Sequence, residues 1–168
     1  MLIEHDGARP RIHPSAYVAP NAVLCGDVEV GPDCRILFGA VLTAEDGPVR
    51  LGERCIVMEN AVLRGRSGHP ARLGAGAEIR INGVLHVNSS LPDGAELPIG
   101  WIAVGDPAQM FPPKAHDEIW AIQRTLDFAG TVAGVDTSAL AGGSAMSQLT
   151  ATYATLYGRH RDDEVIAG

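Results

Sequence analysis

Aliphatic residues recur at every sixth position over the first two thirds of the chain. The series comprises Ile12, Val18, Leu24, Val30, Ile36 and Leu42, then Leu51, Val57 and Leu63, then Leu73, Ile79, Leu85, Leu91 and Leu97. The fourth residue after each is usually small, as at Ala22, Cys34 and Ala61. A period of six fits neither a helix nor an alternating strand, and it is typical of a hexapeptide β-helix. We therefore expect each hexad to form a short strand and a turn, with its aliphatic residue pointing inward.

The series is interrupted twice, by a step of nine residues after Leu42 and by a step of ten after Leu63. Repeats of this class are associated with triangular coils of three hexads each. The sequence therefore predicts a left-handed parallel β-helix of roughly four to five coils over about residues 12–108. Because the two interruptions lie three hexads apart, both insertions should stack at the same corner of successive coils.

The remaining chain has a helical pattern. Pro112-Pro113 should end the β-helix, because proline cannot continue its hydrogen bonding. Apolar residues at helical spacing then predict one helix over about 117–128, with Asp117 as its N-cap. A second helix is expected over 146–158, where a glycine provides a natural stop.

A linker rich in Gly, Ala and Ser, about 129–145, should separate the two helices. The last ten residues are rich in Arg and Asp, and we expect them to be frayed. The chain therefore divides into a β-helix domain, residues 1–113, and a helical C-terminal extension, residues 114–168.

Composition and charge narrow the classes of function. The 168 residues are 46% hydrophobic and 20% charged, which fits a globular chain with a packed core. A net charge of −7 gives no general attraction to nucleic acid or to an anionic membrane. No segment resembles a membrane span or a signal peptide, so we expect a cytoplasmic protein. Cys25, Cys34 and Cys55 form no CxxC pair, and the latter two fall on inward corner positions as core residues.

Polar residues follow the aliphatic position at the corner that carries the insertions. One place after it lie Thr43, Arg64 and His86, and two places further on lie Glu45, Arg66 and Asn88. Adjacent coils are about 4.8 Å apart, so a carboxylate, two guanidiniums and an imidazole should share one patch. Loops 46–50 and 66–72 are expected to overhang this patch, with His69 in the second loop.

Each of these residues also has a purely structural interpretation. Glu45 and Arg64 could form only a cross-strand ion pair on a solvated face. His86 could pack between subunits, and His69 could be an ordinary loop residue. Glu59, on a neighbouring column, could contribute across a subunit interface or simply satisfy a turn.

Three motifs carry a resemblance to a known family. They are Ile12-His13-Pro14, Leu24-Cys25-Gly26-Asp27-Val28, and Gly100-Trp101-Ile102-Ala103-Val104-Gly105-Asp106-Pro107-Ala108. Over roughly residues 8–113 the chain resembles γ-class carbonic anhydrase-like hexapeptide proteins, and the closing motif is shared with hexapeptide acyltransferases. The resemblance implies a left-handed β-helix, a homotrimer and a metal site between neighbouring subunits.

The metal-ligand motifs of that family are eroded here. Its chemistry uses three histidines around zinc or another divalent ion, whose bound water attacks carbon dioxide. By the resemblance, the first histidine falls on Arg64, and of the paired-histidine motif only His86 remains. The expected zinc site is therefore not intact. His69 and His86 from adjacent subunits are the replacement ligands that the sequence suggests.

Three functions stay open at this point. The favoured one is a γ-carbonic anhydrase-like protein with a degenerate or rebuilt site that binds a small anion such as bicarbonate or a carboxylate. Its candidate catalytic residues are His86, Glu45 and Arg64, and its candidate ligand-binding residues are Arg64, Arg66, Asn88 and Glu59. One alternative is a hexapeptide acyltransferase in which a loop histidine is the general base. The other is a γ-class hydratase with a non-standard metal site.

Overall fold

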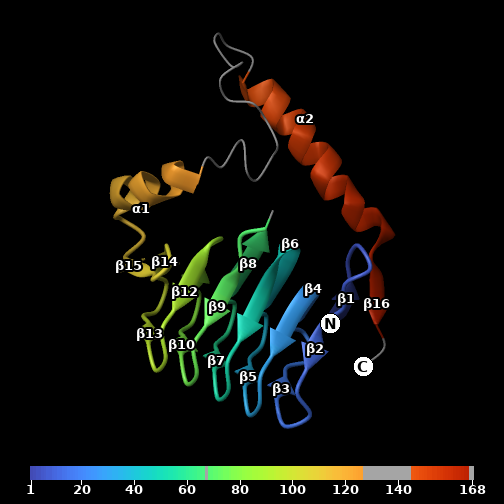
Figure 1. The fold of residues 1–168 in the computed structure, drawn as a ribbon, viewed down its shortest axis with the longest axis vertical. Coiled ribbons are helices and arrows are strands. Elements are labelled where there is room, and N and C mark those ends of the chain that lie inside the picture. Colours follow the sequence, from blue (N-terminus) through green and yellow to red (C-terminus); the bar gives the residue numbers. More distant parts are fainter. Residues whose placement is uncertain (67, 127–144, 167–168) are drawn as a thin grey trace.

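The protein folds into a stack of parallel β-coils, as a computed structural model shows for residues 1–66, 68–126 and 145–166 (Figure 1). The larger sheet comprises β1 (Leu2–Glu4), β2 (Arg11–Ile12), β4 (Val23–Val30), β6 (Val41–Leu51), β8 (Val62–Arg66), β9 (Ala71–Leu73), β11 (Val84–Leu85), β12 (Ser89–Leu91), β14 (Ile102–Val104), β15 (Gln109–Phe111) and β16 (Glu164–Ile166). The smaller sheet comprises β3 (Tyr17–Val18), β5 (Arg35–Ile36), β7 (Ile56–Val57), β10 (Glu78–Ile79) and β13 (Glu96–Leu97). The predicted left-handed β-helix of hexapeptide repeats is confirmed.

The aliphatic residues of the six-residue series fill the interior. Parallel pairing places Leu24, Leu42, Leu63 and Leu85 next to one another on successive coils, and all four are fully buried. Burying each such side chain contributes about 1.5–3 kcal/mol. The repeat therefore builds a continuous apolar column from residues far apart in sequence. The core also contains Cys34 and Cys55, as predicted.

The first insertion differs from the prediction. Residues 46–50 do not form an overhanging loop, because strand β6 continues through them from Val41 to Leu51. The register shifts between Glu45 and Asp46, and Asp46 has a φ of 62°. This bulge absorbs the extra residues, so that Val49 points back into the core.

At the second insertion, His69 lies back against the end of β8. Arg66 and His69 exchange backbone hydrogen bonds of 2.9 and 2.8 Å where β8 ends. Beneath it the coils approach closely. A Cβ at Gly65 would lie 2.3 Å from the carbonyl oxygen of Gly47, so this position requires glycine.

Both predicted helices are present, with different boundaries. They are α1 (His116–Gln123), followed by the 3₁₀ turn η1 (Arg124–Leu126), and α2 (Ala145–Gly158), followed by η4 (Arg159–Asp162). Asp117 is not the N-cap of α1, which is Ala115 and makes no side-chain capping bond. Asp117 instead lies in the first turn, where its charge favours the helix dipole. Most of the predicted linker lies outside the described residues. No described helix is long and apolar enough to cross a membrane.

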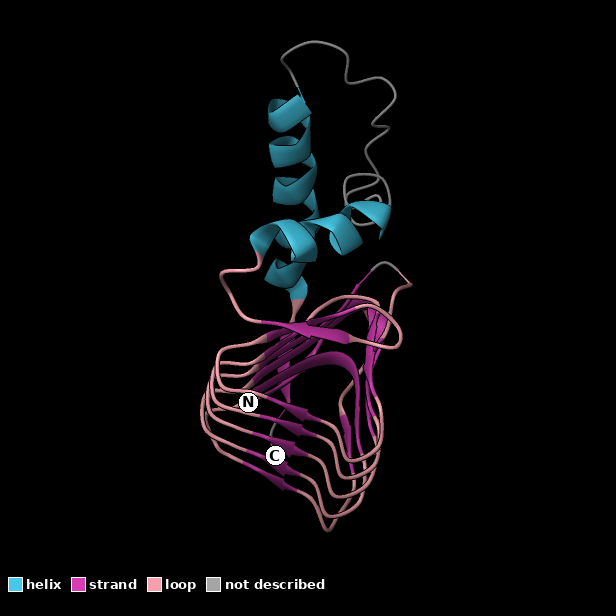
Figure 2. Cartoon of the chain, turned by 90° about the vertical axis from the view of Figure 1, so that its left-hand side faces the viewer, coloured by secondary structure: helices cyan, strands magenta, loops and turns pink. Residues whose placement is uncertain are grey.

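The expectation of a frayed C-terminus is wrong. Strand β16 pairs antiparallel with β1, with Leu2 opposite Ile166 and Glu4 opposite Glu164. The two ends of the described chain therefore meet at the first coil (Figure 1), while the helices gather at one edge of the coils (Figure 2). Strand β16 could not be predicted, because three residues are too few to show a periodic pattern. Its formation depends on pairing with the free edge of β1.

Candidate functional site

The structure brings the predicted column together. Strand pairing sets Cys25 beside Thr43 and Thr43 beside Arg64 on consecutive coils. His86 comes next, because Leu63 and Leu85, the preceding residues, are paired. These side chains point outward from the larger sheet, opposite to the buried leucines.

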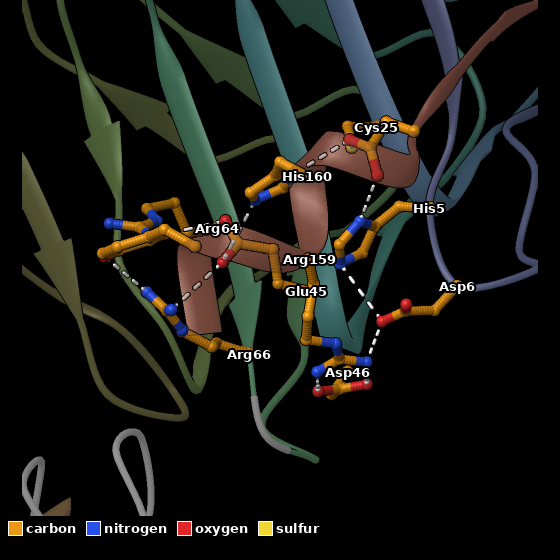
Figure 3. A network of polar contacts seen from close by, with 11 residues as sticks. His5, Asp6, Cys25, Glu45, Asp46, Arg64, Arg66, Arg159 and His160 are labelled. Carbon is orange, nitrogen blue, oxygen red and sulfur yellow. Dashed lines mark hydrogen bonds and ion pairs between the residues drawn. The ribbon is translucent and has the colours of Figure 1, made fainter. Parts of the chain in front are cut away.

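Glu45 is shared by two guanidiniums (Figure 3). Its carboxylate lies 3.5 Å from Arg64 Nη2 and 3.2 Å from Arg66 Nη2. The side chain of Arg66 is 3% exposed, and that of Arg64 is 36% exposed. One carboxylate thus faces two permanent cations, and the excess positive charge is accessible at Arg64.

Tyr157, at the end of α2, covers Arg66. The Nη1 of Arg66 donates to the Tyr157 hydroxyl at 2.9 Å, and its Cζ lies 4.7 Å from the centre of the Tyr157 ring. Burial raises the pKa of Tyr157, but hydrogen bonds to Arg66 and Arg64 and their charges lower it more, so the net shift is downward. The sequence offered no signal for this contact, because helical spacing alone does not place α2 on the coils.

The surroundings of His86 favour its neutral imidazole form. Burial lowers its pKa, a hydrogen bond involving the Val87 backbone raises it, and the charge of Arg64 lowers it further. The net pKa is below the ordinary value of 6.5. A neutral imidazole beside a guanidinium can accept a proton or a hydrogen bond from a bound molecule.

Three of the predicted site residues, Asn88, Glu59 and His69, remain to be placed. Asn88 adopts a left-handed conformation, with a φ of 56°, just before β12. Glu59 lies two residues beyond β7, at a corner of the smaller sheet, so within one chain it is apart from the Arg64 patch. Among the described residues, neither His69 nor His86 belongs to a group of three potential metal ligands. A metal on His69 and His86 would need a second subunit and stays a prediction.

The three-histidine zinc site implied by the resemblance does not fit these residues. Arg64 stands beside His86 in the column, and its guanidinium is paired with Glu45. Arginine has no acceptor atom and stays protonated, so it cannot replace a histidine ligand.

A second polar cluster lies at the first-coil end of the same column. His5 Nδ1 is 2.6 Å from Asp163 Oδ1, and His160 Nδ1 is 2.8 Å from Asp163 Oδ2. The two imidazole rings stack with centres 4.5 Å apart, and Cys25 Sγ lies 3.8 Å from Asp163 Oδ2. These contacts of His160 and Asp163 were not predicted, because the last ten residues were expected to be frayed.

Two groups of this cluster, Cys25 and Asp163, have shifted pKa values. Burial raises the pKa of Cys25 to about 12, and the charges of Asp163 and Glu45 add to this. Burial also raises the pKa of Asp163, but hydrogen bonds from His160 and His5 outweigh it and lower the net value. A cavity of about 190 Å³ adjoins the cluster and is lined by His5, Asp6 and Asp46 among others.

Comparisons with known proteins agree with the architecture. A family model described as bacterial transferase hexapeptide (six repeats) matches residues 9–44. A carbonic anhydrase of Geobacillus kaustophilus (strain HTA426) is 24% identical over 153 residues, covering 74% of this chain and 84% of that protein. The mitochondrial gamma carbonic anhydrase 3 of Arabidopsis thaliana is 34% identical over 83 residues, covering 46% of this chain and 32% of that protein.

Among solved structures, serine acetyltransferase of Neisseria gonorrhoeae in complex with serine matches with a TM-score of 0.40 and 19% identity. That match covers 61% of this chain and 39% of the other. The six-residue repeat and the stacked coils define the fold of this chain as a hexapeptide-repeat β-helix. Its sequence is similar to carbonic anhydrases, including one of the γ class.

Proposed function

We propose that this γ-carbonic anhydrase-like protein binds a small anion, such as bicarbonate or a carboxylate, at Arg64. The observation that carries the proposal is the charge imbalance around Glu45. Of the two guanidiniums that share this carboxylate, Arg66 is buried under Tyr157, whereas Arg64 stays partly exposed. The planar fork of arginine suits a carboxylate or bicarbonate, to which it can donate two parallel hydrogen bonds.

The neighbours of Arg64 have distinct roles in this proposal. Glu45 fixes one edge of the guanidinium, since its Oε1 lies 3.5 Å from Nη2. Neutral His86 can accept a proton from a protonated oxygen of the anion. Arg66 is a positioning residue, because its contacts are with Glu45 and Tyr157.

The test is anion binding by the purified protein and by Arg64→Ala. A charge-assisted hydrogen bond contributes about 1.5–3 kcal/mol, so the variant should bind bicarbonate or acetate at least about tenfold more weakly. Unfolding midpoints measured with and without each anion report this binding. Arg72→Ala is the matched control, because Arg72 is exposed in β9, outside the column of Arg64 and His86, and lies 3.8 Å from Asp106. If neither anion stabilises the wild type, or if Arg64→Ala responds as the wild type does, the proposal is wrong.

An acyltransferase is the second candidate function. Its support is the neutral state of His86, which a general base requires. Adding acyl-CoA to the same series of unfolding measurements separates the candidates. Stabilisation by acyl-CoA that persists in Arg64→Ala would favour the acyltransferase over the anion site.

We also propose that the protein is a homotrimer joined through the coil face that carries Arg64 and His86. A ladder of aliphatic residues points outward from this face and is partly exposed: Val23, Val41, Val62, Val84 and Ile102. A different outward ladder has Glu29 beside Arg50 and Arg50 beside Arg72. An apolar ladder is the better candidate for burial between subunits. In this ladder, Val62 and Val84 precede Arg64 and His86 by two residues. The anion site would therefore lie at the subunit boundary.

A further inference from the structure

We propose that His5, Cys25, His160 and Asp163 bind one transition-metal ion of the Zn²⁺ class. His5 follows β1, Cys25 lies in β4, and the other two belong to the segment after α2. Their four ligand atoms all lie within 4.8 Å of one another. Over the described residues, no other group of three or more His, Cys, Asp or Glu side chains meets this condition.

The donor set selects the class of ion. Two imidazole nitrogens, a thiolate sulfur and a carboxylate oxygen are ligands that zinc takes in tetrahedral sites, at bond lengths of about 2.0–2.3 Å. The Cys25 thiol would release its proton to solvent as the ion binds. Hard cations such as Mg²⁺ or Ca²⁺ prefer oxygen throughout. Such bonds put neighbouring ligand atoms about 3.3–3.8 Å apart. His5 Nδ1 lies 2.6 Å from Asp163 Oδ1, and His160 Nδ1 and Cys25 Sγ lie 2.8 and 3.8 Å from Oδ2, so the two imidazoles would move outward to accept an ion.

The outer nitrogens of both histidines face carboxylates. His5 Nε2 lies 3.3 Å from Asp6 Oδ2, and His160 Nε2 lies 4.0 Å from Glu45 Oε2 (Figure 3). Both rings thus turn Nδ1 toward the centre of the cluster and Nε2 toward an acid. Metal-binding histidines show the same arrangement, because the outer carboxylate fixes the tautomer and raises the basicity of the ring. The two hydrogen bonds to Asp163 do not by themselves require an outer carboxylate beside each ring.

Burial and access agree with a bound ion. The side chain of His5 is 4% exposed, those of Asp163 and His160 are 14% and 33% exposed, and Cys25 is buried. The ion would therefore be enclosed on the side of the coils and approachable beside His160. Because its ligands come from both ends of the chain, it would fasten the C-terminal segment to the first coil.

The experiment uses the full chain, stripped of metal with a chelator and titrated with Zn²⁺ and with Co²⁺. We expect one ion per chain and, with Co²⁺, a sulfur-to-cobalt charge-transfer band in the near ultraviolet. Saturation with Zn²⁺ at a hundredfold excess over Kd should raise the Tm by roughly 5–10 °C, because the ion binds only the folded chain.

Variants assign the ion to these residues. Cys25→Ser should abolish the charge-transfer band, and His160→Gln should weaken binding at least a hundredfold. Asp6→Asn, which removes an outer carboxylate, should weaken it about 10–100-fold. His116→Gln is the matched control, because His116 is exposed on α1. Arg64→Ala should bind the metal as the wild type does, which separates this proposal from the anion site.

Three results would overturn the proposal. The first is the absence of equimolar binding of either ion at micromolar protein. The second is binding that His160→Gln and His116→Gln weaken equally. The third is an ion retained with an unchanged spectrum in Cys25→Ser but lost in His86→Gln. Far-ultraviolet circular dichroism of each variant checks that the coils remain folded.

Discussion

At the scale of single residues, Arg64 and His86 determine each other's chemistry. The Arg64 charge and the burial of the imidazole both disfavour a proton on His86. We expect NMR titration to give His86 a pKa below 6.5, and Arg64→Ala to raise it only part of the way, because burial remains. Arg72→Ala should leave it unchanged. A His86 pKa at or above 6.5 in the wild type would contradict the lowered pKa.

The same shift has a consequence for stability. Below pH 6.5 the unfolded chain binds a proton at His86 more readily than the folded chain does. The free energy of unfolding that His86 contributes is therefore fully present above about pH 6.5 and declines as the pH falls toward the folded pKa.

At this scale, the positions of side chains were predictable from the sequence wherever the repeat fixes them. Thr43, Arg64 and His86 were placed correctly, because every residue of a coil inherits its direction from the hexad. The positions of Tyr157 and Asp163 were not predictable, because these residues reach the same column from outside the repeats. Their positions depend on where a helix docks, and no periodicity encodes that.

At the scale of elements, the insertion corner depends on close contact between coils. Gly65→Ala should lower the free energy of unfolding by about 1–3 kcal/mol, since its Cβ would meet the backbone of Gly47 rather than a movable side chain. Gly158→Ala is the control, because nothing lies within 4 Å of a Cβ at that position. Denaturant unfolding measures both. Equal stability of the two variants would show that the coils can separate at this corner.

Elements were predictable in proportion to their length and regularity. The hexad series predicted the strands and the buried aliphatic core, and apolar residues at helical spacing predicted α1 and α2. The bulge at Asp46 was missed, because a step of nine residues permits either a loop or an extended strand with a bulge. Val49 pairs with Val28 and is buried in the core, which shows that the inserted residues form an extended strand with a bulge.

At the scale of the whole molecule, association should follow the aliphatic ladder. Val62→Lys places a charge in the proposed interface and should convert trimers to monomers, measured by light scattering at micromolar protein. Ile56→Lys is the matched control, because Ile56 also points outward and is partly exposed, but on the smaller sheet. A wild-type monomer, or dissociation by Ile56→Lys alone, would place the interface elsewhere or exclude it.

The antiparallel strands at the two ends of the larger sheet limit how the protein can grow. Inside the stack every neighbour runs in the same direction, and such a ladder could in principle accept a further coil from another molecule. Strand β16 on β1 and strand β15 on β14 both run the opposite way. Each presents a hydrogen-bond spacing that does not match another parallel coil. End-to-end polymerisation into fibres is thereby disfavoured, and copies of this chain are left to meet side by side.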